Sequence, residues 1–291
     1  MQPVSQSKEL LALLITLVLI IIQYFLPDFV AAASPFILMA GMIFPGIPHG
    51  AIDHHIDLKN KSNSYFMLFF LMKYISIMAL VLLIWYWQPL LGLGLFLIYS
   101  LWHFGETDLR RWNSFSPLTA ILGGFSVLML ILSLHAEEFK NYLFYFGLNS
   151  ELFPLWFYQA GIWVSLAGLS YIVFQVTKKQ RLKTMLLIVV LLLGALLPLL
   201  LAFGIYFIVV HSFSGWSDIK NRLKVNQLTM LKYSAPFSFG AFMFFAVFLF
   251  FINQNSSNIQ LYVSAFFIAL ASISAPHVWM MSKFYREATD I

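Results

Sequence analysis

The sequence predicts an all-α fold: a polytopic membrane bundle of about ten transmembrane helices with both termini in the cytoplasm. Three observations carry this prediction. Of the 291 residues, 61% are hydrophobic and 10% are charged, whereas a soluble globular protein has about 45–50% apolar and about 25% charged residues. The apolar residues fall into separate runs close to the roughly 20 residues that one span needs. The basic residues gather at alternate ends of these runs.

Ten segments are expected to span the membrane, with no polar stretch long enough to fold alone between them. They are 9–26, 34–51, 65–87, 89–107, 116–134, 156–176, 183–197, 198–217, 234–252 and 258–281. The first is followed by Pro27-Asp28 and lacks a small-residue cleavage site, so we expect a retained span rather than a signal peptide. We expect one integral membrane domain over 1–291, with span 9–26 peripheral to a motif-bearing core at 34–281.

The seventh and eighth spans come from one apolar run that is too long for a single crossing. Met185 to Trp216 is almost unbroken. Because proline removes a helix hydrogen bond, Pro198 and the nearby Gly204 indicate where the chain turns back.

The positive charges predict the orientation of the bundle. Under this threading, 15 of the 17 Lys and Arg residues lie on one side, the exceptions being Lys73 and Lys140. By the positive-inside rule this side is cytoplasmic, in the cell (inner or plasma) membrane. The net charge of +5 therefore reports topology and lipid headgroups, and we expect the lipid bilayer and no nucleic acid as partner.

Four histidines lie at the same end of four different spans. His49, His103, His211 and His277 each close an even-numbered span, so all four are expected near the inner leaflet. A single histidine in a span is more often a structural hydrogen-bonding residue than a ligand. Four at one depth predict a transition-metal site, because ionisable residues in membranes are costly and imidazole suits Fe, Cu, Zn or Ni. The chain has no cysteines, which excludes thiolate ligands.

Carboxylates accompany these histidines at helical spacing. Asp53 follows His49 by four residues, and Glu106 follows His103 by three. Such offsets share a helix face, and a ligating histidine usually donates its second ring N–H to a carboxylate or carbonyl. We expect these carboxylates in a second shell around the metal.

Other polar residues are weaker candidates. His54 is a reserve ligand, five residues after His49, whereas His55 is expected at the membrane edge. His135 lies on the opposite side and is left out. Lys73 is the one basic residue inside an expected span. A Schiff-base role for it is conceivable, but we expect that its side chain snorkels toward the membrane surface or pairs with Asp53.

At these motifs the chain resembles the Brp/Blh family of membrane proteins from bacteria and archaea, which cleave β-carotene to retinal for rhodopsins. The matching residues are Pro48-His49-Gly50-Ala51-Ile52-Asp53, His103-Phe104-Gly105 with Asp108, Tyr206-Phe207 leading to His211-Ser212, and Pro276-His277. Their order and spacing, from 48 to 277, make the match specific.

The resemblance implies an Fe(2+) centre, β-carotene and O2 as substrates, and a functional link to a retinal-binding rhodopsin. It assigns iron ligation to His49, His103 and His211, and it adds Asp108 and Ser212 to the second shell. The family's fourth histidine falls at Gly215 here, and Ser214 replaces the usual basic residue before it. His277 is then the candidate that completes the shell.

Two other functions stay open at this stage. The chain could be a family relative that binds a carotenoid or retinal without converting it, which is compatible with a glycine at position 215 in place of the family's histidine. A membrane metal or proton transporter is compatible with intramembrane histidines and acids, although the outer halves of the spans are almost purely apolar. A microbial rhodopsin fits poorly, because the number of expected spans is too high and the buried lysine, Lys73, lies in the third span.

Overall fold

The structure is a computed structural model that describes residues 8–57, 64–111, 114–251 and 258–287, and every regular element in these ranges is a helix. The first half comprises α1 (Lys8–Phe25), α2 (Pro27–Gly41), the π-helix η1 (Met42–Gly46), α3 (Ile47–Gly50), α4 (Asp53–Asp57), α5 (Ser64–Trp87), α6 (Pro89–Arg111) and α7 (Pro117–Leu134). The second half comprises α8 (Ala136–Tyr145), α9 (Leu155–Gln175), α10 (Lys178–Gly194), α11 (Leu199–Gly204), the π-helix η2 (Ile205–Ser212), α12 (Phe213–Leu223), α13 (Gln227–Phe251) and α14 (Ile259–Glu287).

Eight helical stretches of the described chain are long and apolar enough to cross a membrane. They are Lys8–Phe25, Pro27–His55, Tyr65–Trp87, Pro117–Leu134, Leu155–Gln175, Leu199–Leu223, Gln227–Phe251 and Ile259–Arg286. The all-helical fold and the multi-pass character are thus confirmed. The expected spans 89–107 and 183–197 lie in α6 and α10, which fall outside this set; α6 ends in charged residues, and α10 is 17 residues long and begins with basic ones.

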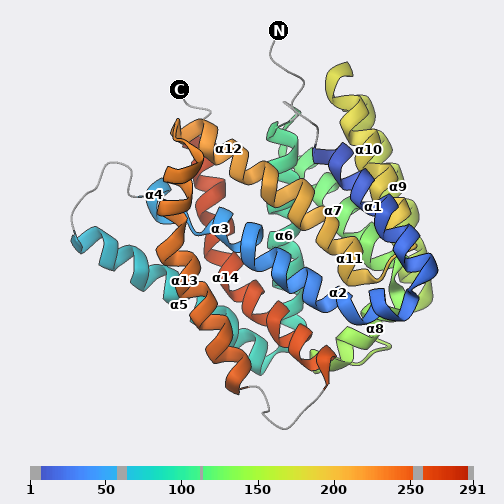
Figure 1. Ribbon diagram of the computed structural model, residues 1–291, viewed down its shortest axis with the longest axis horizontal. Coiled ribbons are helices and arrows are strands. Elements are labelled where there is room, and N and C mark those ends of the chain that lie inside the picture. Colours follow the sequence, from blue (N-terminus) through green and yellow to red (C-terminus); the bar gives the residue numbers. More distant parts are fainter. Residues whose placement is uncertain (1–7, 58–63, 112–113, 252–257, 288–291) are drawn as a thin grey trace.

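The outer surface of the bundle is apolar. Large side chains of α1, α5 and α13 point away from the protein; Ile21, Phe69 and Phe250 are exposed by 58%, 62% and 62%. A soluble monomer rarely shows extensive apolar patches, so this surface indicates contact with lipid. In Figure 1 the first turn of α1, the last turn of α6 and the first turn of α10, all of which carry basic residues, lie toward the same end of the bundle. Which side of the membrane this end faces stays a prediction.

The turn between α10 and α11 falls at Pro198, as the sequence predicts, whereas Gly204 lies where α11 continues directly into η2. Pro198 precedes α11 and ends the preceding turn. Nε2 of the buried His135 lies 3.0 Å from the carbonyl oxygen of Leu197. The backbone N–H of Leu199 donates to the Glu138 carboxylate over 2.9 Å. His135 and Glu138 therefore satisfy backbone groups at this turn, because a helix end buried in apolar surroundings needs polar partners.

Helices α6 and α7 approach each other so closely that only glycine fits at two positions. A Cβ added at Gly105 would lie 1.7 Å from the carbonyl oxygen of Ala120, and one at Gly124 would lie 1.7 Å from that of Leu101. Small residues allow such backbone contact in membrane bundles, where dispersion replaces the hydrophobic effect as the packing force. The contact fixes α6, and with it His103, against the rest of the bundle.

The other motif-bearing helices pack against α6 or against one another. Helix α14 packs against α5, α6 and α4, while α13 packs against α3 and α14. Figure 1 shows α14 crossing behind α3 and α13, with α5 on the outer side. Segments far apart in the sequence, from α3 to α14, therefore meet in one region.

Replacing Gly105 with Ala should destabilise the protein by about 1–3 kcal/mol, the usual cost of overpacking, because the new Cβ would meet backbone that cannot rotate away. Gly94→Ala is the matched control on the same helix, since nothing lies within 4 Å of a Cβ there. Thermal unfolding of both variants in detergent checks this, and equal melting temperatures would contradict the close contact.

Candidate metal centre

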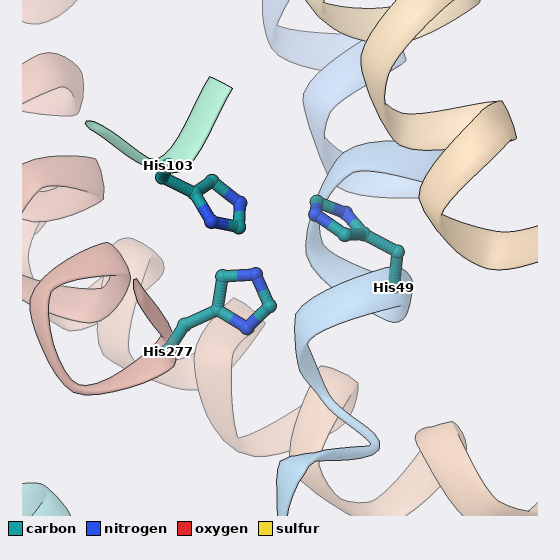
Figure 2. A group of neighbouring side chains, drawn as sticks. All are labelled: His49, His103 and His277. Atoms are coloured by element: carbon teal, nitrogen blue, oxygen red, sulfur yellow. The ribbon is translucent and has the colours of Figure 1, made fainter. Parts of the chain in front are cut away.

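Three buried histidines from three helices point at one another. His49 comes from α3, His103 from α6 and His277 from α14, and each is 5–6% exposed. One ligand nitrogen from each ring lies within 4.8 Å of the others. Figure 2 shows the three rings converging on a common space between their helices. The structure thus brings together residues that are 228 positions apart in the chain (277 − 49).

The fourth predicted histidine borders the same space. The ring centroid of His211 lies 4.9 Å from that of His103 and 5.5 Å from that of His49. Its side chain is 1% exposed and packs against Phe104 at 4.7 Å. His211 is not in the set of three whose ligand atoms all lie within 4.8 Å of one another. It therefore adjoins the three-histidine cluster at slightly longer range.

Several ring nitrogens in this group are buried without a hydrogen bond to the described protein. They are both nitrogens of His103, Nε2 of His277 and Nδ1 of His211. Leaving a buried polar atom unsatisfied costs about 1–3 kcal/mol, so each such atom calls for a reason. Imidazole nitrogens are ligands for iron, copper, zinc and nickel. A metal ion fits this donor set, which would give the orphaned nitrogens a partner.

Two of the rings are oriented through their Nδ1 atoms. Nδ1 of His277 lies 3.0 Å from both carboxylate oxygens of Asp53 in α4, and the hydroxyl of Tyr74 donates to the same carboxylate over 3.3 Å. Nδ1 of His49 donates to the carbonyl oxygen of Gly46. Such bonds fix the tautomer that leaves the Nε2 lone pair for a metal. Asp53 thus orients a histidine of another helix, a link that spacing along the chain did not predict.

Glu106 was expected to support His103, but its hydrogen-bond partners in the structure are Arg110 and Ser282. It accepts hydrogen bonds from Arg110 at 3.0 and 3.1 Å and from Ser282 at 2.6 Å. Ser282 also accepts a bond from the indole of Trp102 over 3.0 Å. Because Ser282 belongs to α14, Glu106 joins the helix of His103 to the helix of His277. Its role in the structure is to clamp these two helices.

Asp108 and Ser212 support the segment that carries His211. Asp108 pairs with Arg111 and accepts a hydrogen bond from Tyr206 over 3.1 Å. Arg111 in turn donates to the carbonyl oxygen of Val210 over 3.3 Å. The hydroxyl of Ser212 donates to the carbonyl of Phe207, five residues earlier, over 2.8 Å. These bonds satisfy carbonyl groups around His211.

Local π-helical geometry accompanies two of the four histidines. η1 ends three residues before His49, and η2 contains His211. A π-turn shifts the register of a helix by one residue and is frequent at functional sites. The exact direction of these two rings therefore depends on an irregularity that a regular helical period does not predict.

Two glycines leave room for the rings. A Cβ on Gly50 would lie 3.2 Å from Nδ1 of His277, closer than most Cβ contacts allow. A Cβ on Gly215 would lie 3.5 Å from Cδ2 of His49, an ordinary contact distance. The position where the sequence resemblance places a further histidine therefore borders the cluster directly.

The cluster opens into an elongated apolar cavity of about 670 Å³, within the roughly 300–1,000 Å³ range of ligand sites. His49, His103, His211 and His277 all line it, as does the reserve candidate His54. The remaining walls are mostly aliphatic and aromatic. Along α5 the lining runs from Phe70 to Leu82, twelve residues apart, or about 18 Å.

His54 and Lys73 have partners of their own. The ring of His54 stacks on Phe237 at 4.1 Å, and its Nδ1 is buried without a hydrogen bond in the described chain. The ammonium of Lys73 lies 3.4 Å from the ring centroid of Trp279. The predicted pairing of Lys73 with Asp53 is replaced by this cation–π contact, which keeps the charge off the cavity wall. Sequence reasoning did not identify Tyr74 as the hydrogen-bond partner of Asp53, although Tyr74 directly follows Lys73.

Comparison with known proteins identifies the family of the chain. The family model of β-carotene 15,15'-dioxygenases matches residues 40–285, which include all four histidines. The chain therefore belongs to this family of carotenoid-cleaving dioxygenases. A β-carotene 15,15'-dioxygenase from the uncultured marine bacterium 66A03 is 24% identical over 255 residues, 85% of this chain and 93% of the relative. No solved structure matches the chain.

Asp53→Asn should weaken metal binding by about tenfold to a hundredfold, the usual effect of losing a partner that orients a ligating histidine. Asp28→Asn, at an exposed carboxylate in the first turn of α2, is the matched control. Titration of the purified, metal-stripped variants with ferrous iron gives the comparison. Identical affinities for wild type and Asp53→Asn would show that the Asp53–His277 contact does not support a metal site.

Proposed function

We propose that this protein is an iron-dependent membrane oxygenase that cleaves β-carotene at its central double bond with O2 to give retinal. The observation that carries the proposal is the buried histidine cluster at the wall of a long apolar cavity, in a chain of the β-carotene dioxygenase family. The reaction breaks one C=C bond and places one oxygen atom of O2 on each carbon, so that each β-carotene gives two aldehydes.

The proposed ligands are His49, His103, His211 and His277. Iron held by these imidazoles would supply the redox chemistry that activates O2. Asp53 holds His277 in the tautomer that ligation needs, and Glu106 holds the helices of His103 and His277 together. The protein's own contribution is to bind and orient the polyene and to exclude water.

The lining of the cavity supports a hydrocarbon substrate. Phe96, Phe104, Phe203 and Phe207 lie on the same cavity as His103. Such walls offer dispersion contacts to a flat, conjugated chain and no hydrogen bonds that an apolar ligand would leave unsatisfied. A charged or strongly polar transport substrate would have to be desolvated against these walls at high cost.

Gly215 favours a second candidate, a carotenoid-binding relative without turnover, because it removes a histidine that the family uses. Pigment that copurifies unchanged, with iron well below stoichiometry, would support this candidate. The position of His277 within the three-histidine cluster favours the enzyme, since it supplies the imidazole that Gly215 lacks.

Expression in cells that accumulate β-carotene tests the activity directly. The wild-type chain should bleach the orange colour and yield extractable retinal, whereas His103→Ala should abolish both, because it removes a central imidazole. His55→Ala is the control, since His55 stacks on Tyr233 and does not line the cavity. Persistent colour without retinal, in cells with iron and well-expressed protein, would reject the proposal.

Gly215→His should increase iron retention, because it adds an imidazole, a ligand that suits iron, beside His49 at a position where a Cβ meets only ordinary contacts. Gly215→Ala adds the Cβ without a ligand and should leave retention unchanged. Iron content after dialysis against a chelator distinguishes the two variants. Equal iron in both would mean that position 215 does not face the metal.

A further inference from the structure

Some residues that line the cavity also lie on the outer surface of the bundle. On α5 these are Ile75, which is 60% exposed, and Ala79. They continue the exposed stripe formed by Leu68, Met72 and Leu83, at the spacing of one helix face. The same face of α5 therefore meets both the cavity and the surroundings of the protein.

Helix α13 also carries residues that both line the cavity and lie on the outer surface. Pro236 and Gly240 both line the cavity and both are exposed. Pro236 lies inside the helix, where it removes a backbone hydrogen bond. Gly240 has no side chain, and a Cβ placed there would find no heavy atom within 4 Å. This part of α13 therefore leaves an open space beside α5.

The opening is closed at one end and leads into the cavity that the four histidines line. The rings of Phe70 on α5 and Phe237 on α13 touch with centroids 6.1 Å apart, which closes the wall at the His54 end. Ile75 directly follows Tyr74, whose hydroxyl donates to Asp53. A ligand that passes between Ile75 and Gly240 would therefore enter the cavity that the four histidines line.

We infer that this opening, with Ile75, Ala79, Pro236 and Gly240 as its rim, is the window through which a linear polyene moves from the lipid bilayer to the histidine cluster. The inference rests on the proposed function, because it identifies the route of that reaction's substrate. The rim carries no charged or hydrogen-bonding side chain, so it admits hydrocarbon and offers nothing to a polar solute. A rigid conjugated rod cannot bend around helices, and a slot beside the site lets it slide in lengthwise.

Gly240→Trp tests the window, because an indole there would fill the open space without a clash at Cβ. Gly94→Trp is the matched control, since Gly94 also has open space at Cβ and does not line the cavity. Full-length, iron-loaded protein in phospholipid nanodiscs is mixed with β-carotene without O2, and binding is followed by the shift of the polyene's visible absorption. O2 is then admitted and retinal is measured.

Gly240→Trp is expected to lower the binding rate and the kcat/KM for β-carotene by about tenfold or more, with the iron content unchanged, while Gly94→Trp stays within about twofold of wild type. Equal binding rates for the two tryptophan variants would overturn the window. If wild type binds β-carotene and Gly240→Trp blocks this, the window stands even where no retinal forms, and only the proposed cleavage fails.

A spin label supplies a readout that is independent of β-carotene. The chain has no cysteine, so Gly240→Cys can be labelled at a single position. A label at the window is expected to collide readily with dissolved O2 and poorly with a water-soluble nickel chelate, as lipid-exposed sites do. Ready collision with the chelate would show that the opening faces water, and this would overturn the inference.

Discussion

The arrangement depends on the burial of imidazole nitrogens that have no partner in the described protein. Nitrogens of His103, His211 and His277 are held in an apolar interior at a cost that a bound ligand would offset. The rest of the structure keeps these rings converged. The glycine contact between α6 and α7 fixes His103, Asp53 orients His277, and the bond of Ser282 to Glu106 joins the two helices that carry them.

The sequence predicted that the four histidines lie close together, because the apolar runs and the basic loops between them indicate how deep each residue lies in the membrane. Span boundaries and basic loops placed His49, His103, His211 and His277 in one layer, and the structure brings the four rings side by side. The partners of the carboxylates were not predictable in this way. Asp53 reaches His277, which is 224 residues away, and no spacing along one helix encodes such a pair. The π-helical turns at η1 and η2 also escape a search for a 3.6-residue period.

The membrane explains why a polar cluster and a hydrocarbon cavity occur together. α5 and α13 present apolar faces outward and apolar walls inward, so the same residue types serve as lipid surface and cavity lining. In the described part of the chain, no lysine or arginine lines this space. Lys73 lies over Trp279, and Arg110 is held by Glu106. The cavity thus combines clustered imidazole side chains with surroundings in which an apolar ligand is soluble.

X-ray absorption spectroscopy of the purified, iron-loaded protein tests the central claim most directly, because it reports the atoms around the metal whatever the substrate is. The proposed function predicts stoichiometric iron with nitrogen nearest neighbours and the multiple-scattering pattern of imidazole, and weakening of this pattern in His103→Ala. Iron far below stoichiometry, or a shell of oxygen atoms that is unchanged in that variant, would contradict a histidine-held metal centre.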